Sequence, residues 1–164
     1  MNLLVQNNYL HSDLGRFACA IGRAGLTTNK FEGDHKTPVG EFKFQKIYYR
    51  KDKLGEFSFK IPFAVIQKND GWCDDPKSKQ YNQHIKFPFD ASAEKLFRDD
   101  DLYDLLCVIN HNTDPIVPGK GSAIFLHISK PNFEGTEGCV AIEKENIIEL
   151  AKKIDVTTKL IIKN

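Results

Sequence analysis

The sequence predicts a mostly β fold with a few helices, in the form of a β-rich sandwich or barrel. Short segments in which apolar and other residues alternate recur along the 164-residue chain, and a period of two residues is typical of strands. Only two segments space their apolar residues as a helix does. The length suits one domain, residues 1–164, which is long enough to bury a core.

Six segments carry the strand pattern. Phe17, Cys19 and Ile21 alternate with other residues, as do Phe42 and Phe44, and the remaining segments are apolar runs. We therefore expect strands at residues 17–21, 42–44, 61–67, 103–109, 122–128 and 159–162.

The strand at residues 122–128 has an unusual pattern. Ala123, Phe125 and His127 share one face, and the isoleucine and leucine residues between and after them share the other. Because both faces are apolar, the segment is expected to be a central, buried strand with one imidazole at its end.

The clearest helix is predicted at residues 143–154. Ile147, Leu150, Ala151 and Ile154 recur at the spacing of one helical face. Glutamates in its first turn and lysines in its last complement the helix dipole. A shorter helix is expected at residues 92–98. The stretch 69–88, rich in Asp, Lys, Asn and Pro, is expected to form a surface loop or lid.

Cys139 and His127 are the candidate catalytic pair. Cys139 ends the segment Thr136-Glu-Gly-Cys and lies just before the predicted helix. Cysteine attacks a carbonyl carbon as the thiolate, and because its ordinary pKa is about 8.5 a neighbouring base is needed. Gly135 and Gly138 allow a tight turn in which amides near Gly138 and Cys139 face a developing oxyanion. The segment predicts a cysteine acyl-transfer enzyme.

Structural alternatives stay open for the same residue types. A histidine on an apolar strand is often a satisfied core residue, and a cysteine often behaves as a small hydrophobe. Cys73 is a rival nucleophile, but the carboxylates of Asp74 and Asp75 would oppose thiolate formation there. The two carboxylates lack a third ligand for a metal ion, so we expect no metal and no cofactor. The four cysteines are expected to be free thiols.

Several motifs together resemble the YkuD family of L,D-transpeptidases. The signature of that family, a histidine, a variable loop and Ser/Thr-x-Gly-Cys, is matched by His127 and by the segment from Thr136 to Cys139. Segments 19–25, 32–40, 71–76, 81–82, 111–112 and 119–127 are also similar. The resemblance implies a mixed β fold, Cys139 as the nucleophile and His127 as the base. It also implies that a backbone carbonyl, which we place at Ile128, orients the imidazole.

Two positions depart from the pattern of the family. Many members carry an arginine two residues after the cysteine, where this chain has Ala141, and glycine or serine after the histidine, where it has Ile128. Another cation must then hold the substrate carboxylate, and the candidates are first Arg98 and then Lys120. The alternative for Arg98 is a solvated surface arginine. The other expected substrate-binding residues are His111, Thr136, Trp72, Asp74 and Asp75.

The resemblance also implies the substrate, because the acyl donor of the family is the stem tetrapeptide of peptidoglycan, cut before its terminal D-alanine. The partners would be stem peptides or muropeptides. The net charge of +1, from 23 basic and 22 acidic residues, gives no general attraction to nucleic acid or membranes. The first residues lack the pattern of a signal peptide. We therefore expect a cytoplasmic monomer, or a periplasmic protein if a leader has been removed.

A cytoplasmic enzyme would meet soluble wall fragments, which favours L,D-carboxypeptidase action on recycled tetrapeptides. The alternatives are a true L,D-transpeptidase that forms peptidoglycan cross-links and an inactive module that binds wall peptides. A papain-like or NlpC-like peptidase fits less well, because those enzymes place cysteine before histidine, the reverse of the order of His127 and Cys139.

Overall fold

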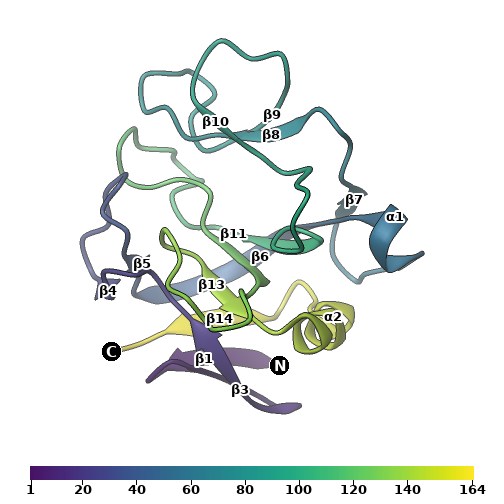
Figure 1. Ribbon diagram of the computed structural model, residues 1–164. Coiled ribbons are helices and arrows are strands. Elements are labelled where there is room, and N and C mark those ends of the chain that lie inside the picture. The colour runs from purple at the N-terminus through teal and green to yellow at the C-terminus, as the bar shows by residue number, and fades with distance from the viewer.

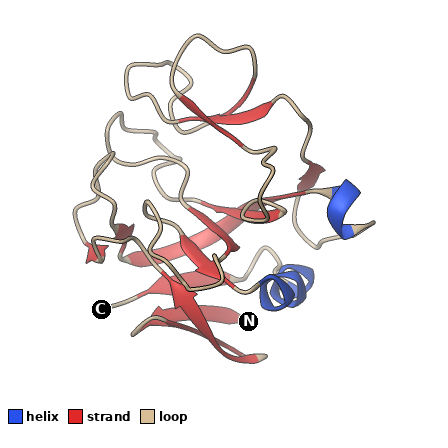
Figure 2. Ribbon diagram, viewed as in Figure 1, coloured by secondary structure: helices blue, strands red, loops and turns tan.

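The computed structural model describes residues 1–164, and strands dominate it (Figure 2). Neither helix is long and apolar enough to span a membrane. The strands are β1 (Asn2–Gln6), β2 (Tyr9–Ser12), β3 (Gly15–Ala20), β4 (Leu26–Thr27), β5 (Thr37–Pro38), β6 (Gly40–Tyr49), β7 (Phe63–Val65), β8 (Asp70–Cys73), β9 (His84–Lys86), β10 (Ala93–Lys95), β11 (Leu105–Ile109), β12 (Phe125–Ile128), β13 (Val140–Ile142) and β14 (Lys159–Ile162), and the helices are α1 (Lys51–Leu54) and α2 (Lys144–Lys153).

The largest sheet closes on itself as a barrel. Its order is β11-β12-β13-β3-β2-β1-β14-β6-β7, and a further pairing of β6 with β11 closes the ring from β11 to β6, with β7 as an additional strand paired to β6. The closure depends on the length of β6, whose first part pairs with β14 while its second part pairs with both β7 and β11. The prediction of a mostly β, barrel-like fold with few helices is confirmed.

The barrel interior and helix α2 share the main hydrophobic core. Ile147, Leu150 and Ala151 of α2 are buried in it beside Leu126 and Ile128 of β12. The amphipathic helix predicted at residues 143–154 is therefore confirmed, with its apolar stripe against the sheet. In Figure 1, α2 lies beside the lower half of the barrel.

Strands β12 and β13 are parallel neighbours, and this pairing sets the geometry of the two candidate catalytic side chains. His127 is in register with Ala141, and Leu126 with Val140. The two-sided pattern of β12 is also confirmed. Leu126 and Ile128 belong to the main core, whereas Phe125 belongs to a second apolar cluster that includes Cys139.

A separate sheet of three strands, in the order β10-β8-β9, covers this second cluster (top of Figure 1). Trp72 on β8 joins the two layers, because its ring meets Phe125 edge-on at 5.2 Å and Tyr48 at 6.4 Å. Its indole N–H donates to Asn82. We call this sheet and the segment from β8 to β10 the lid.

The lid corrects two expectations. The helix predicted at residues 92–98 is wrong, because the residues form β10, which pairs with β8 through Ala93–Cys73 and Glu94–Trp72. Backbone bonds to a neighbouring strand outweigh the weak helical preference of so short a segment. The stretch 69–88 is not one irregular loop, since it contains β8 and β9 paired to each other.

Replacing Trp72 by alanine should loosen the lid and leave the barrel intact. The change removes the ring between the two layers, a loss of about 3 kcal/mol or more for a buried aromatic side chain. Amide hydrogen exchange should become faster in β8, β9 and β10, while β1 and β14 keep the protection of the wild type. The control is Val156→Ala, at a side chain that is 72% exposed. If hydrogen exchange became equally faster in the lid and in the barrel, the prediction that Trp72 stabilises the lid alone would be wrong.

Candidate active site

Cys139 is held at the start of β13 by hydrogen bonds to its backbone. Its carbonyl oxygen accepts from the hydroxyls of Thr136 at 2.7 Å and Thr37 at 3.3 Å. Thr136 is itself tied down, because its amide donates to Ile21 and its carbonyl accepts from the amide of Arg23, both at 2.8 Å. The segment before the cysteine is thus fixed to the end of β3 and to β5.

Two glycines allow this path of the chain. A β-carbon at position 135 would lie 2.7 Å from the Cα atom of Arg23, so only glycine lets the two segments approach. Gly138 has φ of +143°, a conformation that side chains rarely adopt. The amide of Gly138, expected to face an oxyanion, instead donates to the hydroxyl of Thr136 at 3.1 Å. The amide of Cys139 donates to no protein group.

The thiol of Cys139 is buried and neutral. It donates to the carbonyl of Ala123 at 3.1 Å and accepts from the amide of Phe125 at 3.3 Å. Burial raises the pKa of this thiol to about 12, and the nearby charge of Glu94 adds to the effect. Because the charged form is so disfavoured, the resting cysteine is a thiol and needs a base at the moment of reaction.

His127 has the form of a neutral base. Its Nδ1 lies 2.8 Å from the carbonyl oxygen of Ile128, which can only accept, so Nδ1 carries the proton and Nε2 presents its lone pair. Burial lowers the pKa of the imidazole to about 4, although the bond to Ile128 opposes this shift. The ring of Tyr103 meets the imidazole edge-on at 5.2 Å. The backbone carbonyl that orients the histidine is thus at the expected residue.

The two side chains lie on one face of the barrel wall. The register of β12 and β13 continues to place Cys139 beside Phe125, two residues from His127 on the same face. The offset along the strand is roughly 7 Å, and no hydrogen bond joins the thiol to the imidazole. Direct proton transfer therefore requires the thiol to turn from the Ala123 carbonyl toward Nε2.

A pocket of about 370 Å³ opens onto both side chains and lies between the barrel wall and the lid. Of its 21 lining residues only six are hydrophobic. The charged side chains that line it are Lys30, Glu32, Asp74, Glu94, Arg98, Lys130, Glu134 and Glu137. This polar lining suits a peptide with several charged groups rather than an apolar ligand.

Of the two cations predicted to hold the substrate carboxylate, Arg98 lines this pocket. Its guanidinium makes a two-point ion pair with Asp100, through Nε at 2.8 Å and Nη2 at 2.6 Å, and it lies 5.3 Å from the centre of the Tyr103 ring. The Nη1 group has no protein acceptor. Ala141, in register with His127, is buried in the pocket wall and leaves space where many relatives carry an arginine.

Two other predicted residues, Asp74 and Thr136, also line the pocket. One buried carboxylate oxygen of Asp74 has no hydrogen-bond partner. Thr136 supports the cysteine loop through its hydroxyl.

The remaining predicted substrate-binding residues lie elsewhere. His111 and Lys120 line a neighbouring pocket, where the imidazole of His111 donates to the Lys120 carbonyl. Trp72 is buried between lid and barrel, and Asp75 caps a turn by accepting from the amide of Lys77. For these four residues the structure corrects the expectation of direct contact with the pocket at Cys139. The four cysteines are free, as expected.

Several charged residues of the pocket were missed, among them Lys30, Glu32 and Glu94. Lys30 and Glu32 lie in the loop before β5. The sequence pattern that could have indicated them is the alternation of charged and uncharged residues beside Gly33. Glu94 fell within the segment misread as a helix. It accepts from the hydroxyl of Tyr103 at 2.9 Å, and burial raises the pKa of its carboxyl.

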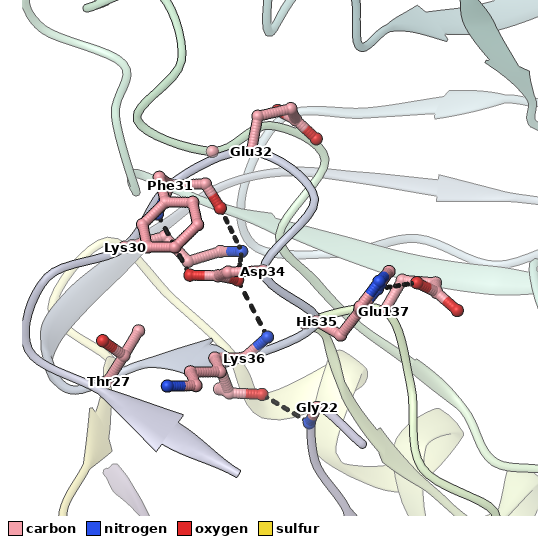
Figure 3. A network of polar contacts seen from close by, with 12 residues as sticks. Gly22, Thr27, Lys30, Phe31, Glu32, Asp34, His35, Lys36 and Glu137 are labelled. Carbon is pink, nitrogen blue, oxygen red and sulfur yellow. Dashed lines mark hydrogen bonds and ion pairs between the residues drawn. The ribbon is translucent and has the colours of Figure 1, made fainter. Parts of the chain in front are cut away.

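The same loop also forms the rim of the pocket (Figure 3). His35 contacts the carboxylate of Glu137, and Arg23 lies 3.0 Å from the His35 ring and 3.4 Å from Glu137. Because Glu137 stands between Thr136 and Gly138, these contacts fasten the cysteine loop to the loop before β5.

Comparisons with known proteins agree with this geometry. A search of curated proteins returns no match. The fold matches a structure of Bd1075 from Bdellovibrio bacteriovorus with a TM-score of 0.51 and 18% sequence identity, over 98% of this chain and 46% of that one. This match shows a shared fold, and the chain spans about half the length of that structure. The sequence matches the YkuD family, described as the L,D-transpeptidase catalytic domain, over residues 4–162. The chain therefore belongs to the YkuD family of L,D-transpeptidase catalytic domains.

Proposed function

We propose that this protein is an L,D-carboxypeptidase that removes the terminal D-alanine from peptidoglycan tetrapeptides through a thioester on Cys139. The observation that carries the proposal is the shared pocket, in which Cys139 and His127 lie on one face and Nε2 of the imidazole presents a free lone pair. Membership of the YkuD family supports the class of substrate.

The reaction starts from neutral groups. The proton of the thiol passes to Nε2 of His127 as the sulfur attacks the carbonyl carbon of the scissile bond. The imidazolium then gives this proton to the amine of the departing D-alanine, and the thioester remains. His127 next takes a proton from a water molecule that attacks the thioester. The tripeptide acid leaves, and the imidazolium returns a proton to the Cys139 sulfur.

Arg98 stands where the leaving group departs. Its guanidinium lies 5.3 Å from the centre of the Tyr103 ring, and the same ring meets the His127 imidazole edge-on, so Arg98 lies on the histidine side of the pocket. The carboxylate of the terminal D-alanine leaves from that side, together with the amine that His127 protonates. With Nη1 free of protein acceptors, Arg98 can bind this carboxylate while it keeps its pair with Asp100.

Water is the acceptor that the lining of the pocket favours. Eight of the 21 lining residues are charged, and charged side chains hold water around them. Hydrolysis needs only water at the thioester, whereas transfer to a peptide amine needs a second site that orients the amine. The alternative, formation of L,D cross-links, is the other outcome of the experiment below.

Purified protein should release D-alanine from a disaccharide tetrapeptide and leave the tripeptide acid as the main product, even with a millimolar peptide amine present. Mass spectrometry separates the tripeptide from a dimer or an amine adduct. Cys139→Ser should abolish the release. The matched variant Cys73→Ser should keep it, because Cys73 is buried within the lid and lines no part of the pocket. A dimer as the main product would identify a transpeptidase instead.

His127→Ala should lower kcat by about 10²- to 10⁴-fold, the range for loss of general acid–base catalysis. In the wild type, the base works only while it is unprotonated, and its pKa is lowered to about 4. The acid limb of kcat/KM should therefore lie well below pH 6.5, the ordinary value for histidine. The exposed His11→Ala variant serves as the control. A limb centred at pH 6.5 or above would contradict the assignment of a buried, neutral base.

Arg98→Ala should raise KM for the tetrapeptide about 10- to 100-fold, since a charge-assisted hydrogen bond contributes about 1.5–3 kcal/mol. The protein should remain folded, because Asp100 is half-exposed and tolerates the loss of its partner. Arg16→Ala, an exposed arginine outside the pocket, is the matched control. A substrate amidated at the terminal carboxylate should show the same high KM with both the wild type and Arg98→Ala. An unchanged KM in Arg98→Ala would show that Arg98 does not bind the substrate carboxylate.

A further inference from the structure

The pocket wall contains a buried ion pair that the proposed mechanism does not use. The ammonium of Lys30 contacts the carboxylate of Asp34, and the residue is only 8% exposed. The amides of Phe31 and Lys36 donate to the same carboxylate, at 3.1 and 2.9 Å (Figure 3). Burial opposes ionisation of Asp34, but these bonds outweigh it and lower the pKa of the carboxyl. The pair is fixed in place and charged.

The Lys30 side chain occupies space that two glycines leave open beside the nucleophile. A β-carbon at Gly121 would lie 2.9 Å from its Cγ atom, and a β-carbon at Gly138 would lie 3.5 Å from its Nζ atom. Gly138 directly precedes Cys139. The ammonium therefore lies against the backbone that presents the sulfur.

One donor of this ammonium is unused. A lysine ammonium has three N–H groups. One contacts Asp34, a second donates to the carbonyl of Phe31 at 3.2 Å, and the third has no protein acceptor. A buried donor without a partner that lines the pocket is available to a group of the substrate.

We infer that Lys30 is a catalytic residue whose ammonium stabilises the negative charge on the Cys139 sulfur and then on the oxyanion of the tetrahedral intermediate. The inference rests on the proposed function for the identity of the oxyanion. Lys30 keeps its three protons throughout, because the proton of the thiol goes to Nε2 of His127. The amide of Gly138 already donates to Thr136 and does not reach the oxyanion. Lys30 takes its place as the second donor, beside the free amide of Cys139.

The charges around the thiol agree with this role. Besides burial, Glu94 and Glu137 raise the pKa of Cys139, whereas the amide of Phe125 and the ammonium of Lys30 lower it. Lys30 is thus the cation that opposes two carboxylates at the sulfur. The other cation of the pocket acts on the base, because Arg98 lowers the pKa of His127.

The test compares three variants by the rate at which iodoacetamide alkylates Cys139 at pH 8, followed by peptide mass spectrometry. Lys30→Met alone leaves a buried carboxylate without its counter-charge and can unfold the protein. The variant to use is Lys30→Met/Asp34→Asn, which removes both charges. Its alkylation should be slower, by up to about tenfold, because the variant loses the cation that lowers the thiol pKa, and one nearby opposite charge is worth about one pKa unit. Asp34→Asn alone should be faster than the wild type.

The matched control is Lys159→Met/Glu41→Gln, which removes an exposed ion pair on the barrel and should alkylate at the wild-type rate. Thermal unfolding confirms that each variant is folded. With tetrapeptide, the Lys30→Met/Asp34→Asn variant should lose about 10²-fold in kcat with KM within about twofold. Unchanged alkylation in this variant would overturn the inference. A raised KM with normal kcat would overturn it as well, since Lys30 would then hold a substrate carboxylate.

The alkylation assay contains no peptide, so it tests the role of Lys30 independently of the proposed carboxypeptidase activity. If the wild type leaves the tetrapeptide intact while the variants still change the alkylation rate as expected, the proposed substrate is wrong and the role of Lys30 at the sulfur stands. If the tetrapeptide is cleaved but the Lys30→Met/Asp34→Asn variant matches the wild type in both assays, the proposed function stands and the role of Lys30 falls.

Discussion

The parallel pairing of β12 with β13 is the constraint on which the site depends. Its register sets Ala141 beside His127 and carries Cys139 to the level of Phe125, so thiol and imidazole share one face of a closed barrel. A shift by one residue would turn the thiol to the opposite face, into the main core. The threonine bonds to the Cys139 carbonyl and the close approach of Gly135 to Arg23 secure the same register from outside the sheet.

Burial of this pair determines its chemistry. In a solvated cleft, a thiol and an imidazole can rest as an ion pair, but here burial raises the pKa of Cys139 and lowers that of His127. Both effects favour the neutral forms, so charge appears only as the sulfur attacks. The lid contributes to this burial through the contact of Trp72 with Phe125 of the barrel wall, and it also brings Glu94 to the pocket. One small sheet thereby controls both the dielectric environment and the charges of the site.

Local patterns in the sequence missed β1, β2 and β13, but they predicted helix α2 and six of the nine strands of the barrel sheet. They did so because strand alternation and helical spacing record which side of each element is buried. The lid was harder, since its strands are three or four residues long and are stabilised by pairing to one another rather than by their own composition. Lys120 was expected in the pocket at Cys139 because its glycine-flanked turn precedes β12, and His111 because its segment resembles the family. Both residues line the neighbouring pocket instead.

Ala141 links these observations. An arginine at this position would project into the pocket beside His127 and bring its charge within the barrel wall. With alanine there, the two cations that we propose to act in the reaction come from separate segments, Arg98 after the lid and Lys30 before β5. Each cation is held by its own carboxylate, Asp100 or Asp34, which fixes its geometry before any substrate arrives. Because a preformed ion pair needs little reorganisation as charge develops, this division preserves electrostatic stabilisation at both ends of the scissile bond without an arginine on β13.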